Sequence, residues 1–481
     1  MKRNEGFLEY KVIPPSLAYI DRMLRRVREL VGNNRELILF GILLEASLII
    51  FLTVTGVDRG SYLLEIFFWL PFTVYILAIW RIPKRISATE KAISFGQISA
   101  IILMFAIIFH ATLLFSQSPL SNDIYTYCWD GKVFNNGINP YAYSPDASQL
   151  SFLRDANWES VMNTNVHATY PPLSQIVFAV AYSIFPSIFT LKLCSVLFCL
   201  LSTWILTLIL KELCLDVRYS IIYAWSPLAV IEFANSGHID SLAILLVLLS
   251  FLLLIKKRMV LSSATMALAV LAKVYPLLFA PLFLLRWGKK GALVFAGVIA
   301  AFYLPFLSAG TDVVGGLSYF FEKGFFNGSL FPLLHTGLGT IMERGESLLV
   351  SKVIVFLVFV CLLIYLAYRY SRSLKQKEDN LILWKYSFWL TGAFLLLSPT
   401  VHPWYLIWVL PFLCFFRSPS WILLTGTMIL ARSVYIGYEA TGVWKEIWWI
   451  RLCEYIPFYL LLFHEMSFGR RLARTIREAI L

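Results

Sequence analysis

The sequence predicts an all-α polytopic membrane protein with about 12 to 14 transmembrane helices. Apolar residues make up 59% of the chain, only 15% of residues are charged, and mean hydropathy is +0.73, whereas soluble proteins are about 45–50% apolar and about 25% charged. The spans are expected to be helices because apolar stretches approach the ~20 residues that cross a bilayer and barrel-type alternation is absent. The longest stretches are residues 37–55, 62–80, 92–115, 239–255 and 347–368.

The basic residues predict one orientation for these helices. Clusters in short loops together hold 29 of the 41 Lys and Arg residues, and such loops usually face the cytoplasm. The net charge of +12 therefore indicates orientation rather than a nucleic-acid partner. The clusters are residues 2–35, 81–91, 211–218, 256–258, 286–290, 369–377, Arg417 and 470–477.

Placing every basic cluster in the cytoplasm determines which spans run outward and which run inward. Three spans lead to an acidic loop at 116–171, which is expected outside. The segment 173–185, bracketed by prolines, is expected to lie in the outer interface, because a crossing there would invert every later cluster. The remaining spans are expected near 187–210, 219–235, 239–255, 259–272, 275–287, 291–308, 347–368, 382–398, 404–416, 421–437 and 447–463.

The chain is thus expected to have three parts, with both termini in the cytoplasm. Residues 1–36 form a basic segment in which Ser16–Leu30 has the pattern of an amphipathic surface helix, although a short soluble extension is the alternative. Residues 37–463 form the transmembrane core, with outer loops at 116–171 and 309–346, and residues 464–481 form a basic tail. The seven cysteines are scattered without a CxxC pair, which argues against a disulfide framework or a metal site.

The first outer loop carries the strongest candidate for catalysis. Asp123 and Asp130 are seven residues apart, which on a helix places both carboxylates on nearly one face, and a carboxylate at the mouth of a bundle suits a general base. The alternatives are a helix cap for Asp123 and a turn at Asp130. The aromatic and basic neighbours that could bind substrate are Tyr125, Tyr127, Trp129 and Lys132.

Three more segments place polar residues on the same outer face, where polar groups near a membrane usually mark a site or a buried pair. His238 could recognise an anionic head group, and Lys273 could bind a phosphate, although a cap at Asp240 and a snorkelling lysine are equally compatible. Trp404 is explained by an interfacial aromatic belt, but His402 is not. The candidate substrate-binding residues here are His238, Asp240, Lys273, Tyr275, His402 and Trp404.

These motifs resemble those of the GT-C glycosyltransferases, and most closely the polyprenyl-phosphate-mannose-dependent mannosyltransferases, with a more distant likeness to the GPI mannosyltransferases. The resemblance covers residues 115 to 410 and depends most on residues 121–132 and 136–141, followed by Tyr170-Pro171-Pro172-Leu173. Thr126 departs from the pattern, because an arginine is commoner there. The resemblance implies a GT-C-like bundle whose outer first loop carries juxtamembrane helices.

The resemblance also implies a reaction on the outer face of the plasma membrane. A hexose, first of all mannose, would pass from a polyprenyl-phosphate sugar to a glycolipid, glycan or protein acceptor. Asp123 would act as base in one inverting displacement, which parallels inverting glycosidases. Lys273, His238 and His402 would stabilise the leaving phosphate, so neither a metal nor another cofactor is required.

Two other functions are compatible with a polytopic chain. A transporter or flippase of lipid-linked sugars would place charged residues along a path at the bilayer midplane, whereas here they gather on one face. A polysaccharide polymerase or ligase would use a lipid diphosphate and is expected to have arginine-rich outer loops. The outer loops here contain few arginines.

Overall fold

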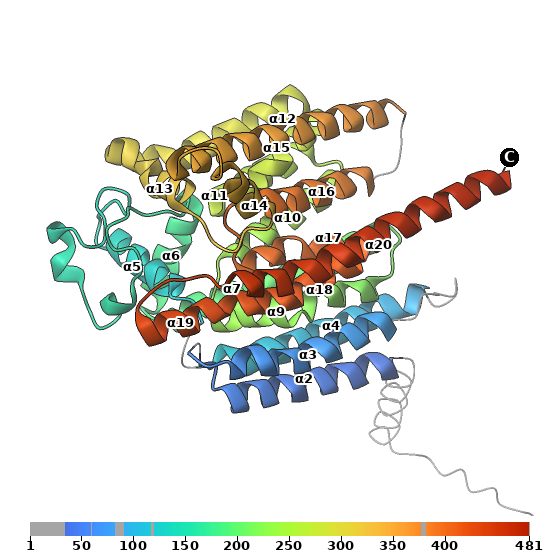
Figure 1. The fold of residues 1–481 in the computed structure, drawn as a ribbon, viewed down its shortest axis with the longest axis horizontal. Helices are drawn as coiled ribbons and strands as arrows, with labels where there is room; N and C mark the ends of the chain where they lie inside the picture. Colours follow the sequence, from blue (N-terminus) through green and yellow to red (C-terminus); the bar gives the residue numbers. More distant parts are fainter. Residues whose placement is uncertain (1–33, 59, 82–90, 117–119, 377–380, 481) are drawn as a thin grey trace, which may run out of the picture.

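The computed structural model describes residues 34–58, 60–81, 91–116, 120–376 and 381–480, apart from the side chains of 91–94 and 468–480. These residues form a bundle of mostly parallel and antiparallel helices, with no strand beyond isolated bridges within the described part (Figure 1). The all-α prediction is therefore confirmed. The expected surface helix at Ser16–Leu30 lies outside the described residues.

The helices and helical turns follow one another with short connections, except for residues 136–171, which contain only two short helical turns. The helices are α2 (Arg35–Thr55), α3 (Leu63–Arg81), α4 (Lys91–Leu114), α5 (Asp123–Asn135), α6 (Pro172–Ile184), α7 (Ile188–Glu212), α8 (Ile221–Ala224), α9 (Pro227–Val230), α10 (Asp240–Ile255), α11 (Met259–Ala272), α12 (Ala280–Tyr303), α13 (Gly315–Lys323), α14 (Leu330–Leu338), α15 (Arg344–Lys375), α16 (Leu381–Leu397), α17 (Leu410–Phe416), α18 (Pro419–Thr427), α19 (Ser433–Thr441) and α20 (Trp448–Ile480). The shorter helical turns are η1 (Ser148–Leu153), η2 (Trp158–Ser160), η3 (Val217–Ser220), η4 (Ile231–Asn235), η5 (Tyr275–Phe279), η6 (Leu304–Val314), η7 (Pro403–Trp408) and η8 (Met428–Arg432).

Seven helical stretches within the described residues are long and apolar enough to cross a membrane, and five shorter apolar helices accompany them. The shorter ones are Pro172–Ile184, Asp240–Ile255, Met259–Ala272, Leu381–Leu397 and Pro403–Phe416. The chain is thus a polytopic membrane protein. The number of crossings stays a prediction, because the five shorter helices fall below the ~20 residues of a full span.

The interior helices are broken where the sequence predicts continuous spans. The segment 219–235 divides into η3, α8, α9 and the π-helical turn η4. One break comes at Ser226, which precedes Pro227, and proline disfavours helical backbone in the residue before it. The two spans expected on either side of residue 288 do meet at a break: α12 is interrupted at Gly288, which has φ 67° and ψ −172°, a conformation that only glycine adopts readily.

The connections gather at opposite ends of the bundle (Figure 1). The start of α2, the end of α3, the start of α4, the end of α15 and the end of α20 lie at one end. The helices α5, α6, α13 and α19 lie at the other. The two predicted outer loops therefore share one end of the molecule, opposite the helix ends that adjoin the basic clusters.

The first outer loop packs against the second at this end. Helices α5 and α6 are held together by Tyr127, whose ring stacks on Phe178 with centroids 4.5 Å apart. Asn139 donates hydrogen bonds from Nδ2 to the Phe306 carbonyl and to Ser308 Oγ, at 3.0 and 2.9 Å. These contacts position the loop over the bundle, where the start of α5 lies against the turn between η4 and α10.

Candidate active site

Asp123 is the first residue of α5, and its carboxylate remains partly open to solvent, with 31% of the side chain exposed. The expected helix cap is absent: the Asp123 amide instead donates to Ser121 Oγ at 3.3 Å. Its Oδ2 atom accepts a hydrogen bond from the Tyr170 hydroxyl at 3.3 Å and lies 3.8 Å from His238 Nδ1. The carboxylate is thus held on two sides and open on another.

His238 lies under Asp123 because of a tight turn at Gly237. Gly237 has φ 71°, a left-handed conformation that favours glycine, and a Cβ there would come within 2.4 Å of Ile124 Cδ1, so a larger residue would also require the end of the Ile124 side chain to move. The His238 side chain is fully buried. Its ring stacks on Trp404, with centroids 4.1 Å apart and an interplanar angle of 22°.

A buried ion pair lies beneath His238. Glu232, in the π-helical turn η4, accepts a hydrogen bond from Arg432 Nη2 to Oε1 at 2.6 Å, while its Oε2 atom lies 3.3 Å from His238 Nε2. Glu232 is fully buried and Arg432 is nearly so. Arg432 also donates to the Leu120 carbonyl at 3.2 Å, which connects the pair to the chain just before α5.

A second ion pair joins the starts of α10 and η5. Lys273 Nζ lies 2.8 Å from Asp240 Oδ2, and the Trp408 indole donates to Asp240 Oδ1 at 2.7 Å. Asp240 is fully buried, whereas 14% of the Lys273 side chain is exposed. Both carboxylate oxygens are therefore occupied, and the expected cap role of Asp240 is replaced by positioning of Lys273.

Tyr170 connects the two charged groups. Its hydroxyl contacts Asp123 and, at 2.8 Å, the Tyr127 hydroxyl, while Lys273 Nζ lies 5.2 Å from its ring centroid. Tyr405 provides a second aromatic face, with its centroid 5.6 Å from the same ammonium. Such positions over aromatic faces are favourable for a cation, so Lys273 is held against the ring of the same tyrosine whose hydroxyl contacts Asp123.

A continuous stack of rings forms one wall of the site. Phe326 from the second outer loop stacks on His402 at 4.8 Å, His402 stacks on Trp404 at 4.3 Å, and Trp404 stacks on His238. Phe326 is held by backbone hydrogen bonds, from its amide to the Pro399 carbonyl at 3.0 Å and from the Val401 amide to its carbonyl at 2.8 Å. Burial, with the nearby positive charges, lowers the pKa of His402 to about 3.

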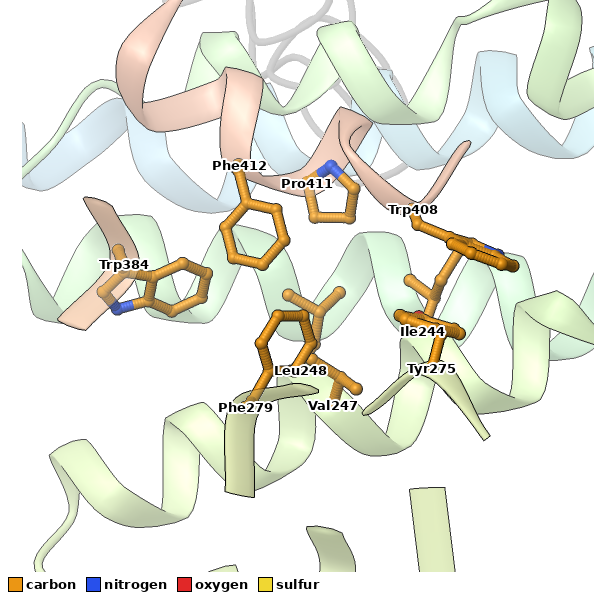
Figure 2. A pocket seen from close by; sticks show the side chains of 9 residues that line it. All are labelled: Ile244, Val247, Leu248, Tyr275, Phe279, Trp384, Trp408, Pro411 and Phe412. Atoms are coloured by element: carbon orange, nitrogen blue, oxygen red, sulfur yellow. The ribbon is translucent and has the colours of Figure 1, made fainter. Parts of the chain in front are cut away.

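An apolar pocket lies next to the second ion pair (Figure 2). It begins at Tyr275 and Trp408, whose rings stack 4.2 Å apart and nearly parallel. From there it extends between helices toward Trp384. Its lining residues are all apolar or aromatic: Ile244, Val247, Leu248, Tyr275, Phe279, Trp384, Trp408, Pro411 and Phe412.

The lower half of α5 is not part of this cluster. Asp130 shares a helix face with Asp123, as expected, but it is buried and accepts a hydrogen bond from Gln175 Nε2 at 2.9 Å; this burial raises its pKa to about 7. Trp129 packs on Trp158, with centroids 5.0 Å apart, and Lys132 pairs with Asp155 at 2.8 Å. Tyr125 is partly buried against the small apolar cluster that Trp129 forms with Val133, Leu150, Leu153 and Val161.

Several residues of the site were not anticipated. Glu232 and Arg432 are each the one charged residue in an otherwise apolar expected span, at 219–235 and 421–437, and this signal could have identified both. Tyr170 belongs to the Tyr-Pro-Pro-Leu element that contributes to the resemblance, but no site role was predicted for it, and Phe326 carries no comparable signal in a sequence rich in aromatic residues. Among the described residues, no group of three or more His, Cys, Asp or Glu side chains could hold a metal ion.

Comparison with known families identifies the class of this site. Residues 39–289 match a family model described as alpha-(1->6)-mannopyranosyltransferase, N-terminal domain. This range is about half of the chain and includes Asp123, Glu232, His238, Asp240 and Lys273. A search of curated proteins gives no match. The chain belongs to the alpha-(1->6)-mannopyranosyltransferase family and is a membrane glycosyltransferase of the mannosyltransferase class.

Proposed function

We propose that this mannosyltransferase takes mannose from a polyprenyl phosphate and transfers it to a hydroxyl of a glycolipid, glycan or protein in one inverting step. The observation that carries the proposal is that Tyr170 contacts both the partly exposed Asp123 carboxylate and Lys273, with an apolar pocket next to the ion pair of Lys273 and Asp240. The reaction requires a base for the acceptor hydroxyl, a cation for the leaving phosphate and an apolar site for the lipid chain of the donor. Single displacement inverts the anomeric carbon, so an alpha product requires a beta-linked donor.

Asp123 is the base in this proposal. It removes the proton of the acceptor hydroxyl as the oxygen attacks the anomeric carbon and the bond to the phosphate oxygen breaks. Its carboxylate is held by Tyr170 and faced by His238 while one side remains open. A positioned base of this kind contributes roughly 10²–10⁴-fold to rate.

Lys273 is the best-placed cation for the departing phosphate. It is the partly exposed member of its ion pair, and its three donors can reorient toward phosphate oxygens. His238 is fully buried. The low pKa of His402 leaves that ring neutral at physiological pH. We therefore assign the leaving-group charge to Lys273 alone and the two histidines to the wall of the site.

The donor would reach this site from the lipid. The pocket adjoining Tyr275 and Trp408 has the apolar lining that an isoprenoid chain requires, and Trp408 also positions Asp240; this small pocket would have to widen to admit the first isoprenoid unit. The basic clusters support an orientation in which this end of the bundle faces out across the plasma membrane and both termini are cytoplasmic.

The test is transfer by purified protein in nanodiscs. Radiolabelled mannose on a polyprenyl phosphate would be offered with glycolipid, oligosaccharide and peptide acceptors, and GDP-mannose would be the alternative donor. We expect transfer from the lipid-linked donor to one acceptor class, with an alpha linkage, and none from GDP-mannose. The matched controls are Asp123→Asn, expected to be inactive, and Asp146→Asn, an exposed substitution in the same loop, expected to be active.

Two outcomes would contradict the proposal. Transfer from GDP-mannose alone would remove the lipid-linked donor. Movement of the intact lipid-linked sugar across the bilayer without transfer would indicate a flippase instead.

A further inference from the structure

The buried residues behind Asp123 form a chain of alternating charge-bearing groups that the transfer reaction itself does not require. The order is Asp123, His238, Glu232 and Arg432, with atom separations of 3.8, 3.3 and 2.6 Å. Only Asp123 at one end is open to solvent; the other three side chains are at most 4% exposed. This arrangement calls for an explanation, because burying an isolated charge is costly.

Stability alone is a weak explanation for the pair at the end of this chain. Replacing a buried ion pair by apolar residues is often neutral or stabilising, and Glu232 and Arg432 occur in segments that are otherwise suited to apolar packing. The ion pair with Arg432 also uses only one of the two carboxylate oxygens of Glu232. Its Oε1 atom takes the Arg432 hydrogen bond, and its Oε2 atom is left facing His238.

Glu232 holds His238 in two ways. The His238 amide donates to the Glu232 carbonyl at 3.0 Å, and the Glu232 carboxylate faces Nε2 of the ring. Trp404 fixes the plane of the ring by stacking on it. The ring can therefore neither turn nor reach substrate, and its Nδ1 atom is held toward Asp123.

We infer that Glu232 and Arg432 are positioning residues that act through His238 to orient the Asp123 carboxylate. Arg432 fixes Glu232, Glu232 fixes the His238 ring, and the ring fixes the oxygen of Asp123 that does not face the acceptor. The inference rests on the proposed transfer reaction with Asp123 as base. It assigns roles to two residues that the reaction never touches, since both are shielded from the site by His238.

The test is a double-mutant cycle on transfer kinetics. We expect Glu232→Gln and His238→Ala each to lower kcat by about 10- to 100-fold, with the KM values of donor and acceptor changed less than about threefold. Because Glu232 acts through His238, adding Glu232→Gln to His238→Ala should cause no further loss. Glu45→Gln is the matched control, a lone carboxylate on α2 whose partner is Thr112, and it should leave kcat unchanged.

Glu232→Gln leaves Arg432 buried without an ionic partner, so a separate control is needed to distinguish lost catalysis from misfolding. The paired variant Glu232→Gln/Arg432→Gln removes both charges together and should show the same loss of kcat with a wild-type melting temperature. Arg432→Lys keeps the positive charge, so its kcat should be higher than that of the paired variant.

Three outcomes would overturn the inference. Unchanged kcat in the paired variant, or losses that multiply in the double mutant, would make the pair merely structural and leave the proposed function intact. A wild-type protein that transfers no mannose from a polyprenyl phosphate would overturn the proposed function, and this inference with it.

Discussion

The two ends of α5 hold their carboxylates in contrasting ways. Asp123 at the start is partly exposed and is faced by a hydroxyl and an imidazole. Asp130, two turns later on the same face, is buried and contacts the neutral amide of Gln175. Burial without a charged partner favours the protonated form, whereas exposure with donors nearby keeps a carboxylate available to a substrate. The sequence spacing is the same for both, so the neighbours decide which of the two can act as a base.

The largest effect should separate the two aspartates by activity. Asp123→Asn removes the base and should lower kcat by about 10³- to 10⁴-fold, equivalent to about 4 to 5 kcal/mol of activation free energy. Asp130→Asn should keep kcat within about threefold, because this side chain does not reach the site. Initial rates with saturating donor would measure both. Equal losses would mean that Asp130 takes part in the reaction.

The next effect concerns stability and pH. The pKa of Asp130 is raised to about 7 in the folded protein, so the folded state keeps a proton that the unfolded chain releases as pH rises above about 4. Stability should therefore fall between pH 4 and 7, by at most about 4 kcal/mol. Asp130→Asn should remove this loss, which gives it a higher melting temperature than wild type at pH 8.5 and a similar one at pH 4.

Asp155 offers a control with the opposite sign. Burial acts to raise its pKa, but the hydrogen bonds from Lys132 and the backbone outweigh that effect and lower it. Asp155→Asn should therefore destabilise the protein at pH 7 and lose this effect toward acid pH. The same thermal scans would detect it. A rise in melting temperature for both variants at pH 8.5 would show that burial of Asp130 is not the cause.

A smaller effect is expected at the cation beside Asp123. Lys273→Gln should lower kcat by about 10²-fold, because one charged donor to the leaving phosphate is lost. Lys273→Arg should recover part of it. The variant Asp240→Asn/Lys273→Gln removes the partner charge as well, so it tests whether the loss comes from the site or from an unpaired Asp240. Recovery of the full rate in the double variant would contradict a role at the phosphate.

The smallest effect should come from the residue shared by both ends of α5. Tyr170 contacts Asp123 through its hydroxyl, while its carbonyl accepts a 3.4 Å hydrogen bond from Gln175, the partner of Asp130. Tyr170→Phe removes the hydroxyl contacts with Asp123 and Tyr127 and leaves the carbonyl contact with Gln175 in place. We expect kcat to fall by about threefold to tenfold, in line with about 1 kcal/mol for one hydrogen bond, with the pH dependence of melting unchanged. A changed pH dependence would show that the hydroxyl also supports Asp130.

Much of the fold could be predicted from the sequence, but only part of the candidate site. Apolar length predicted the helices, and lone polar residues between spans singled out Asp123, His238, Lys273 and His402, which the structure connects through Tyr170 and Trp404. The break at Gly288 agrees with the predicted end of one span at 287 and start of the next at 291, whereas the break at Ser226 was missed because hydropathy averages over it. Periodicity also could not show that Asp130 faces Gln175 of α6, since that depends on tertiary packing.

The pair of Glu232 and Arg432 escaped prediction for a related reason. Each looks like a stray charge in its own segment, and their contact spans 200 residues of sequence. Helical periodicity relates residues that are close in the sequence, and the positive-inside rule considers only the charges in loops. Neither could have paired these two residues.

This separation has a consequence for how the protein is made. At a synthesis rate of about 5–20 residues per second, Glu232 leaves the ribosome roughly 10 to 40 s before Arg432. During that interval a lone carboxylate must enter or wait beside the bilayer without its ionic partner. The ion pair can form only after η8 has been made, when α19 and α20 alone remain to be added. In a chain whose Asp123 depends on this pair, as inferred above, the site would be completed only late in membrane insertion.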